Sequence, residues 1–89
     1  MLVRRRLVVH GAVQGVGFRA WAWRTASQRG VAGRAHNRPD GTVEVVLEGE
    51  PEAVEAVVRA CHEGPRSAVV TEIELSEEEP EGLRGFSAG

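Results

Sequence analysis

Three glycines and an arginine lie where an alternating apolar segment gives way to an amphipathic one, in the stretch HGAVQGVGFRAWAWR of residues 10–24. Glycines permit torsions that turn consecutive N–H groups inward, and such groups at the start of a helix form a concave anion site. Arg19 falls in the first turn of that helix, where a cation opposes the helix dipole. A phosphate held by the N–H groups and the planar guanidinium would make this placement favourable. The stretch therefore predicts a phosphate site, although the pattern equally allows a tight connection with a solvated Arg19.

Other candidate polar groups are few, because the chain has no lysine or tyrosine and a single asparagine, Asn37. Asn37 precedes the turn sequence RPDGT, and the residues alone favour a role in that turn. The three histidines, His10, His36 and His62, match no zinc-binding spacing, so we expect no metal and no cofactor. No motif groups His, Asp or Cys as a base or nucleophile. The chemistry that remains is positioning and charge stabilisation.

The composition fits one small globular domain over residues 1–89. A net charge of −2 gives no bulk attraction to nucleic acid, and Arg4, Arg5 and Arg6 are predicted to form a solvated edge. The one cysteine, Cys61, fits a reducing compartment and a buried apolar position. No apolar run is long enough for a membrane span or a secretory signal. We expect a cytoplasmic monomer that binds no membrane.

Hydrophobic periodicity predicts the order strand, helix, strand, strand, helix, strand, with a short further strand at the end. Turn and end signals at Gly11, Gly30, Pro39-Asp40-Gly41 and Gly64-Pro65 separate these elements. The acidic run Glu77–Glu81 is predicted as a solvated loop. The predicted elements are a strand over Val3–His10, a helix over Phe18–Arg29, a hairpin over Ala32–Glu48 whose first strand is Arg34–Arg38, a helix that begins at Pro51 and has an apolar face reaching Cys61, a strand over Ala68–Leu75, and a weak last strand including Leu83 and Phe86.

This order favours an α+β fold, the ferredoxin-like α/β sandwich (βαββαβ). Two interlocked right-handed βαβ units give an antiparallel sheet of four to five strands with both helices on one face. Trp23 points away from the apolar stripe of the first helix, so it covers a neighbouring edge or stays partly exposed. The residues predicted to be buried are Phe18, Trp21, Ala22, Thr25 and Ala26 on the first helix, and Ala53, Val54, Val57, Val58 and Cys61 on the second.

The segment from Val8 to Gly49 resembles the signature of the acylphosphatase family. That signature reads G-x-V-Q-G-V-x-F-R, then a helix ending near a glycine, then G-x-x-x-N-x-x-D-G-x-V-E. The chain supplies the first motif over residues 11–19 and the second over residues 33–44. The stretch GPRSAVVTEIEL, residues 64–75, is similar to the family's G-P-x-x-A-x-V segment. The similarity covers nearly the whole chain.

The resemblance implies metal-independent hydrolysis of acyl phosphates, the mixed anhydrides of a carboxylic acid and phosphoric acid. The products are a carboxylate and inorganic phosphate, and the latter is also the expected inhibitor. Because a carboxylate is a stable leaving group, no general acid is needed. Asn37 is implied to orient the attacking water. The groups implied to hold the phosphoryl group are the Arg19 side chain and the backbone amides of Gly15, Val16, Gly17, Phe18 and Arg19.

Two other functions stay open. Ferredoxin-like sandwiches also serve as non-catalytic modules that bind anions or nucleic acid. RNA-binding versions carry aromatic residues on their central strands, and the predicted hairpin has none. The acylphosphatase-like module also occurs at the start of large carbamoyl-transfer proteins, which makes a carbamoyl-phosphate-processing subdomain the second alternative. The chain lacks zinc-finger-like cysteines that would favour it.

Overall fold

Strand β1 (Val3–Ala12) lies inside the sheet, and its alternating residues give it one apolar face, on which Leu7 and Val9 are fully buried. It pairs antiparallel with β3 (Val43–Gly49) on one side and with β4 (Val69–Glu78) on the other. The computed structural model describes residues 1–88. It places β2 (Ala32–Asn37) beside β3 and the short β5 (Phe86–Ala88) at the far edge. The strand order is β4-β1-β3-β2-β5.

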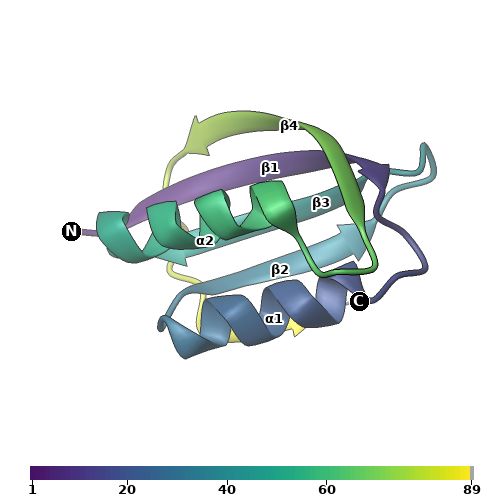
Figure 1. Ribbon diagram of the computed structural model, residues 1–89. Coiled ribbons are helices and arrows are strands. Elements are labelled where there is room, and N and C mark those ends of the chain that lie inside the picture. The colour runs from purple at the N-terminus through teal and green to yellow at the C-terminus, as the bar shows by residue number, and fades with distance from the viewer. Residues whose placement is uncertain (89) are drawn as a thin grey trace.

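Helices α1 (Phe18–Gln28) and α2 (Pro51–Glu63) cover the same face of this sheet (Figure 1). The predicted ferredoxin-like α+β fold is therefore confirmed. Neither helix within residues 1–88 is long and apolar enough to cross a bilayer. Cys61 is buried, as its position in the apolar stripe of the second helix predicted. Burial raises the pKa of its thiol to about 12, so the thiol stays protonated. The buried helix residues are Phe18, Ala22, Ala26, Val54, Val57, Val58 and Cys61.

The sheet is mixed, and the prediction of an antiparallel sheet was wrong at its last strand. β5 pairs parallel with β2. β4 runs antiparallel to β1, so it ends where β1 and β2 begin. The segment between β4 and β5 crosses the sheet at that end, so β5 runs in the same direction as β2. Leu83 was predicted within the last strand, but it belongs to this connection.

The predicted limits of two strands were also wrong. β1 does not end at Gly11 but continues to Ala12 through a bulge between His10 and Gly11. Gly11 fits there because an added Cβ would lie 2.0 Å from the carbonyl oxygen of Val69. β2 begins at Ala32 and ends at Asn37, because Ala32 and Gly33 already pair with Glu48 and Leu47 of β3.

Arg4 is buried, which contradicts the prediction of a solvated arginine edge. Its side chain is 1% exposed. Its guanidinium donates to Glu78 from Nε at 2.8 Å and to Glu48 from Nη1 at 2.7 Å. These carboxylates stand opposite Arg4 in the register of β4 and β3. The sequence of β1 alone could not reveal that pairing.

The acidic run Glu77–Glu81 is likewise not a solvated loop throughout. β4 extends to Glu78, whose carboxylate accepts hydrogen bonds from both Arg4 and Arg6. The bond from Arg6 has the larger effect and the bond from Arg4 the next, and they lower the pKa of Glu78 to about 2. The run is therefore part of the ionic packing that attaches β4 to β1.

Candidate active site

The chain between β1 and α1 turns through glycines in left-handed conformations. Gly15 has φ 74° and Gly17, the N-cap residue of α1, has φ 79°. A residue with a Cβ would pay roughly 1–2 kcal/mol for this conformation. The N–H groups of residues 15–20 make no well-formed hydrogen bond to any carbonyl or side chain among residues 1–88. They are available as donors at the positive end of a helix.

Arg19 lies in the first turn of α1, as predicted, and is partly buried. That turn contains no acidic residue. Arg19 also belongs to none of the ion pairs formed within the described part of the chain. The cation at this helix terminus is therefore not compensated by a carboxylate of residues 1–88.

Asn37 is the last residue of β2 and is exposed. β1 and β2 both run antiparallel to β3, so they are parallel to each other and end at the same end of the sheet. Figure 1 shows the connection from β1 to α1 and the turn after β2 at that end. This topology brings Asn37 beside the glycine-containing loop.

A hollow of about 270 Å³ lies between the loop and Asn37. It brings together the predicted residues Gly15, Gly17, Phe18, Arg19 and Asn37. Val16 was also predicted but does not line the hollow. The lining residues are Val13, Gly15, Gly17, Phe18, Arg19, Ala20, Trp23 and Asn37.

Side-chain hydrogen bonds attach the loop to its neighbours. Gln14 Nε2 donates to the carbonyl oxygens of Arg38 at 2.7 Å and Thr42 at 2.9 Å. These carbonyls flank the turn that follows Asn37. The loop that carries Arg19 is thereby tied to the hairpin that carries Asn37.

Two further contacts fix the ends of this arrangement. The Ser67 hydroxyl donates to the carbonyl oxygen of Val16 at 2.7 Å, which links the loop to the chain before β4. The Asp40 carboxylate accepts hydrogen bonds from the hydroxyl and the backbone N–H of Thr42. These bonds lower the pKa of Asp40. The carboxylate thus closes the turn and does not enter the hollow.

Sequence reasoning missed three residues that line the hollow, of which Trp23 is the largest. Trp23 lies one helical turn after Arg19, and residues four apart share a helix face. That spacing of four residues is the signal in the sequence that could have found it. Val13 and Ala20, the other two, are small apolar residues with no such signal.

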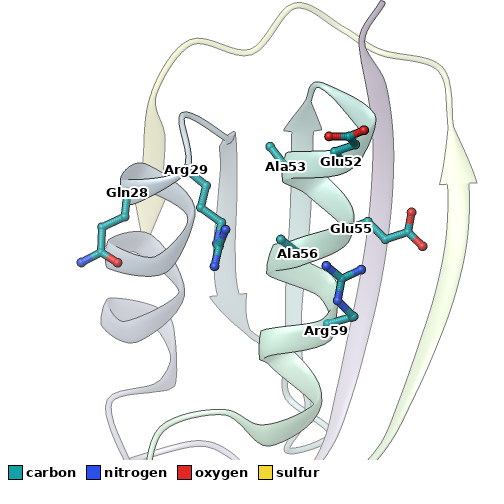
Figure 2. A pocket seen from close by; sticks show the side chains of 7 residues that line it. All are labelled: Gln28, Arg29, Glu52, Ala53, Glu55, Ala56 and Arg59. Atoms are coloured by element: carbon teal, nitrogen blue, oxygen red, sulfur yellow. The ribbon is translucent and has the colours of Figure 1, made fainter.

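A larger hollow of about 600 Å³ lies between the two helices (Figure 2). It is lined by charged side chains of both signs on exposed helix surfaces, and it contains none of the predicted site residues. The residues from which the sequence predicts chemistry therefore lie around the smaller hollow and not around the larger one. The residues around the larger one are Gln28, Arg29, Glu52, Ala53, Glu55, Ala56 and Arg59.

No histidine of residues 1–88 lines the smaller hollow. His10 contacts Glu74 and His36 contacts Glu44, and neither histidine lines the hollow. No three His, Cys, Asp or Glu side chains of the described chain are grouped to hold a metal ion. The groups that can act on a ligand there are backbone N–H donors, one guanidinium and one carboxamide.

Comparisons with known proteins show which family the chain belongs to. The family model described as Acylphosphatase matches residues 5–88. An acylphosphatase of Thermococcus kodakarensis is 55% identical over 84 residues, covering 94% of this chain and 92% of that relative. The crystal structure of acylphosphatase from Bacillus subtilis superposes with a TM-score of 0.94 at 40% identity, covering 100% of this chain and 99% of that one. Full-length HypF in its phosphate- and nucleotide-bound form superposes with a TM-score of 0.89 at 27% identity, over 100% of this chain but 12% of HypF.

Proposed function

The chain belongs to the acylphosphatase family and hydrolyses acyl phosphates, and from that premise we propose how its residues divide the work. The N–H groups of the loop and the Arg19 guanidinium hold the phosphoryl group, and Asn37 positions the attacking water. The loop donors are those of Gly15, Val16, Gly17, Phe18 and Arg19. The observation that carries this proposal is the shared hollow between Arg19, the glycine loop and Asn37.

The phosphoryl oxygens are held by two kinds of donor that suit a dianion. Backbone N–H groups at the start of α1 point their dipole at the ligand and need no reorganisation during the reaction. The planar fork of Arg19 can donate to two oxygens at once, which an ammonium cannot do. As negative charge builds up on these oxygens during the reaction, both donors stabilise it.

The hydrolysis needs little else from the protein. The Asn37 side-chain carbonyl accepts a hydrogen bond from water and directs its oxygen toward phosphorus. The new P–O bond forms as the bond from phosphorus to the bridging oxygen breaks, and that electron pair leaves with the carboxylate. The proton lost by water is taken up by the phosphate product. Because the carboxylate leaves as a stable anion, no histidine or acid is required to protonate it.

An assay with benzoyl phosphate and an Asn37→Ala variant tests the assigned roles. We expect the variant to lose activity by on the order of 10²–10³-fold, because water is no longer positioned. The inhibition constant for phosphate should change by less than about twofold, since the loop and Arg19 are intact. His36→Ala removes the neighbouring side chain, which contacts Glu44 outside the hollow, and should behave like the wild type. Full turnover by Asn37→Ala would overturn the role of Asn37.

We also propose that the protein works as a cytoplasmic, single-domain monomer over residues 1–89, without a metal or other cofactor and without nucleic acid. The net charge of −2 supports the absence of a nucleic-acid partner. Hydrolysis in the presence of a chelator tests metal independence, and analytical ultracentrifugation tests the oligomeric state. The alternative functions are not favoured, because relatives at about half identity are acylphosphatases, whereas HypF is 27% identical over the shared region.

A further inference from the structure

Trp23 is a large aromatic side chain that lies half exposed beside the smaller hollow, and the proposed hydrolysis mechanism gives it no role. It is 49% exposed. The other tryptophan of α1, Trp21, packs against Phe18 with ring centroids 5.3 Å apart. An indole left in water gives up the favourable burial that Trp21 obtains. Packing of the fold therefore does not explain why a tryptophan stands at position 23.

The position of Trp23 relative to Arg19 is set by the helix. The two residues are four apart on α1, so their side chains lie on one face. The Cα–Cβ bond of a helical residue tilts toward the helix N-terminus, which directs Trp23 back toward Arg19. Both side chains line the same hollow.

The lining of the hollow has a polar part and an apolar part. Arg19, Asn37 and the loop glycines make up the polar part, while Val13 and Trp23 belong to the apolar part. Its volume of about 270 Å³ is close to the ~300 Å³ at the lower end of small-molecule pockets. A phosphoryl group alone fills only a portion of that space.

An acyl phosphate likewise has a polar half and a less polar half. Its phosphoryl half is charged, and its acyl half is uncharged and joined through one bridging oxygen. When the phosphoryl half occupies the polar part of the hollow, the acyl half must lie against the remaining lining or at its rim. Trp23 offers the largest apolar surface there.

We propose that Trp23 is a specificity-determining residue that stacks on the acyl group of the substrate and favours flat apolar acyl groups. This inference rests on the proposed function of Arg19, Asn37 and the loop. Benzoyl phosphate is then a better substrate than acetyl phosphate, whose methyl group covers little of the indole. Carbamoyl phosphate is disfavoured for the same reason, since its amide gains nothing from an apolar surface.

The test compares kcat/KM for benzoyl phosphate and acetyl phosphate in the wild type, Trp23→Ala, Trp23→Phe and Leu75→Ala. Loss of one aromatic contact corresponds to a change of roughly tenfold. Trp23→Ala should therefore reduce the ratio of the two kcat/KM values about tenfold, mainly through KM for benzoyl phosphate. Trp23→Phe should restore most of that ratio. Leu75→Ala removes a similarly exposed apolar side chain, 53% exposed on β4, and should leave the ratio unchanged.

Inhibition constants of phenylphosphonate and methylphosphonate provide a second measurement that does not depend on turnover. Phenylphosphonate should inhibit the wild type more strongly than methylphosphonate, and Trp23→Ala should remove the difference. Equal loss for both substrates in Trp23→Ala, or equal inhibition of the wild type by both phosphonates, would overturn the inference. Failure of the proposed function gives a different pattern, in which Asn37→Ala keeps full turnover while the preference for the aryl ligand persists.

Discussion

The two ends of the sheet each combine consecutive backbone N–H groups with an arginine, but within residues 1–88 only one end supplies its own anion. Where the connection from β4 to β5 crosses the sheet, the Glu48 carboxylate accepts hydrogen bonds from three N–H groups and from Arg4. The three N–H donors are Glu81 at 2.7 Å, Gly82 at 3.0 Å and Leu83 at 3.0 Å. At the other end, the N–H groups of residues 15–20 and Arg19 have no such carboxylate among residues 1–88.

The two arginines differ in burial as well as in partners. Arg4 is 1% exposed and fully paired, whereas Arg19 is only partly buried and lines an open hollow. Burial alone would raise the pKa of Glu48, but the N–H donors and Arg4 together lower it to about 2. The same kind of donor set therefore stabilises the fold at one end. At the other end the donors have no carboxylate partner among residues 1–88, and we propose that the phosphoryl group of the substrate takes that place.

Replacing Arg19 should cause the largest loss of activity. We expect Arg19→Ala to lower kcat/KM for benzoyl phosphate by on the order of 10³-fold, equivalent to about 4 kcal/mol, because the transition state loses its only guanidinium. Arg19→Lys should also lose most phosphate affinity, since a point charge cannot form the fork. Steady-state kinetics and the phosphate inhibition constant measure both effects. An unchanged inhibition constant in Arg19→Lys would mean that the loop binds anions without the arginine.

Replacing Arg4 should damage the fold and spare the chemistry. Arg4→Met leaves Glu48 and Glu78 without their buried cation, which costs about 3 kcal/mol of unfolding free energy. Urea denaturation measures this loss. The folded fraction should keep kcat/KM within about twofold, because roughly 25 Å of strand separates Arg4 from the loop. Arg4→Lys retains the charge and should lose less stability. A large loss of kcat/KM with normal stability would show that the two ends are not independent.

Acid should weaken the Glu48 end first. The folded-state pKa of Glu48 and of Glu78, about 2 in each case, lies below the ordinary value of 4.5. Their stabilising contribution is therefore complete above about pH 4.5 and is lost as the pH falls toward 2. We expect Tm to fall across this interval in the wild type and less steeply in Glu48→Gln. Glu79→Gln, at an exposed position without an ion pair among residues 1–88, serves as control. Identical slopes for Glu48→Gln and the wild type would refute this assignment.

Sequence alone could predict which residues meet at the proposed active site better than it could predict the Arg4 ion pairs. The loop, Arg19 and Asn37 belong to motifs that are local in the chain, and the order of strands and helices brings those motifs to one end of the sheet. The pairing of Arg4 with Glu48 and Glu78 depends on register between strands 44 and 74 residues apart. Periodicity cannot specify that register, because each of the three strands carries more than one charged residue on the same face.

Trp23 shows a different limit of sequence reasoning. Helical spacing places it off the buried stripe and on the same face as Arg19. Whether an exposed aromatic residue faces solvent or a ligand site depends on what stands opposite, and here that is the end of β2. The parallel pairing of β5 was unpredictable for a related reason, because it follows from the path of the segment that crosses the sheet.

The smallest expected effect is a gain of stability when the charge of Arg19 is removed. A cation in the first turn of α1 opposes the helix dipole, and no acidic residue of that turn offsets it. Arg19→Gln should therefore raise the free energy of unfolding by about 0.3–1 kcal/mol at low ionic strength. Salt should abolish the gain by screening the charge. Arg24→Gln, an exposed arginine in the middle of the same helix, is the matched control and should be nearly neutral. A loss of stability in Arg19→Gln that persists in high salt would show that Arg19, like Arg4, contributes to the fold. The contrast between the two ends would then be one of degree.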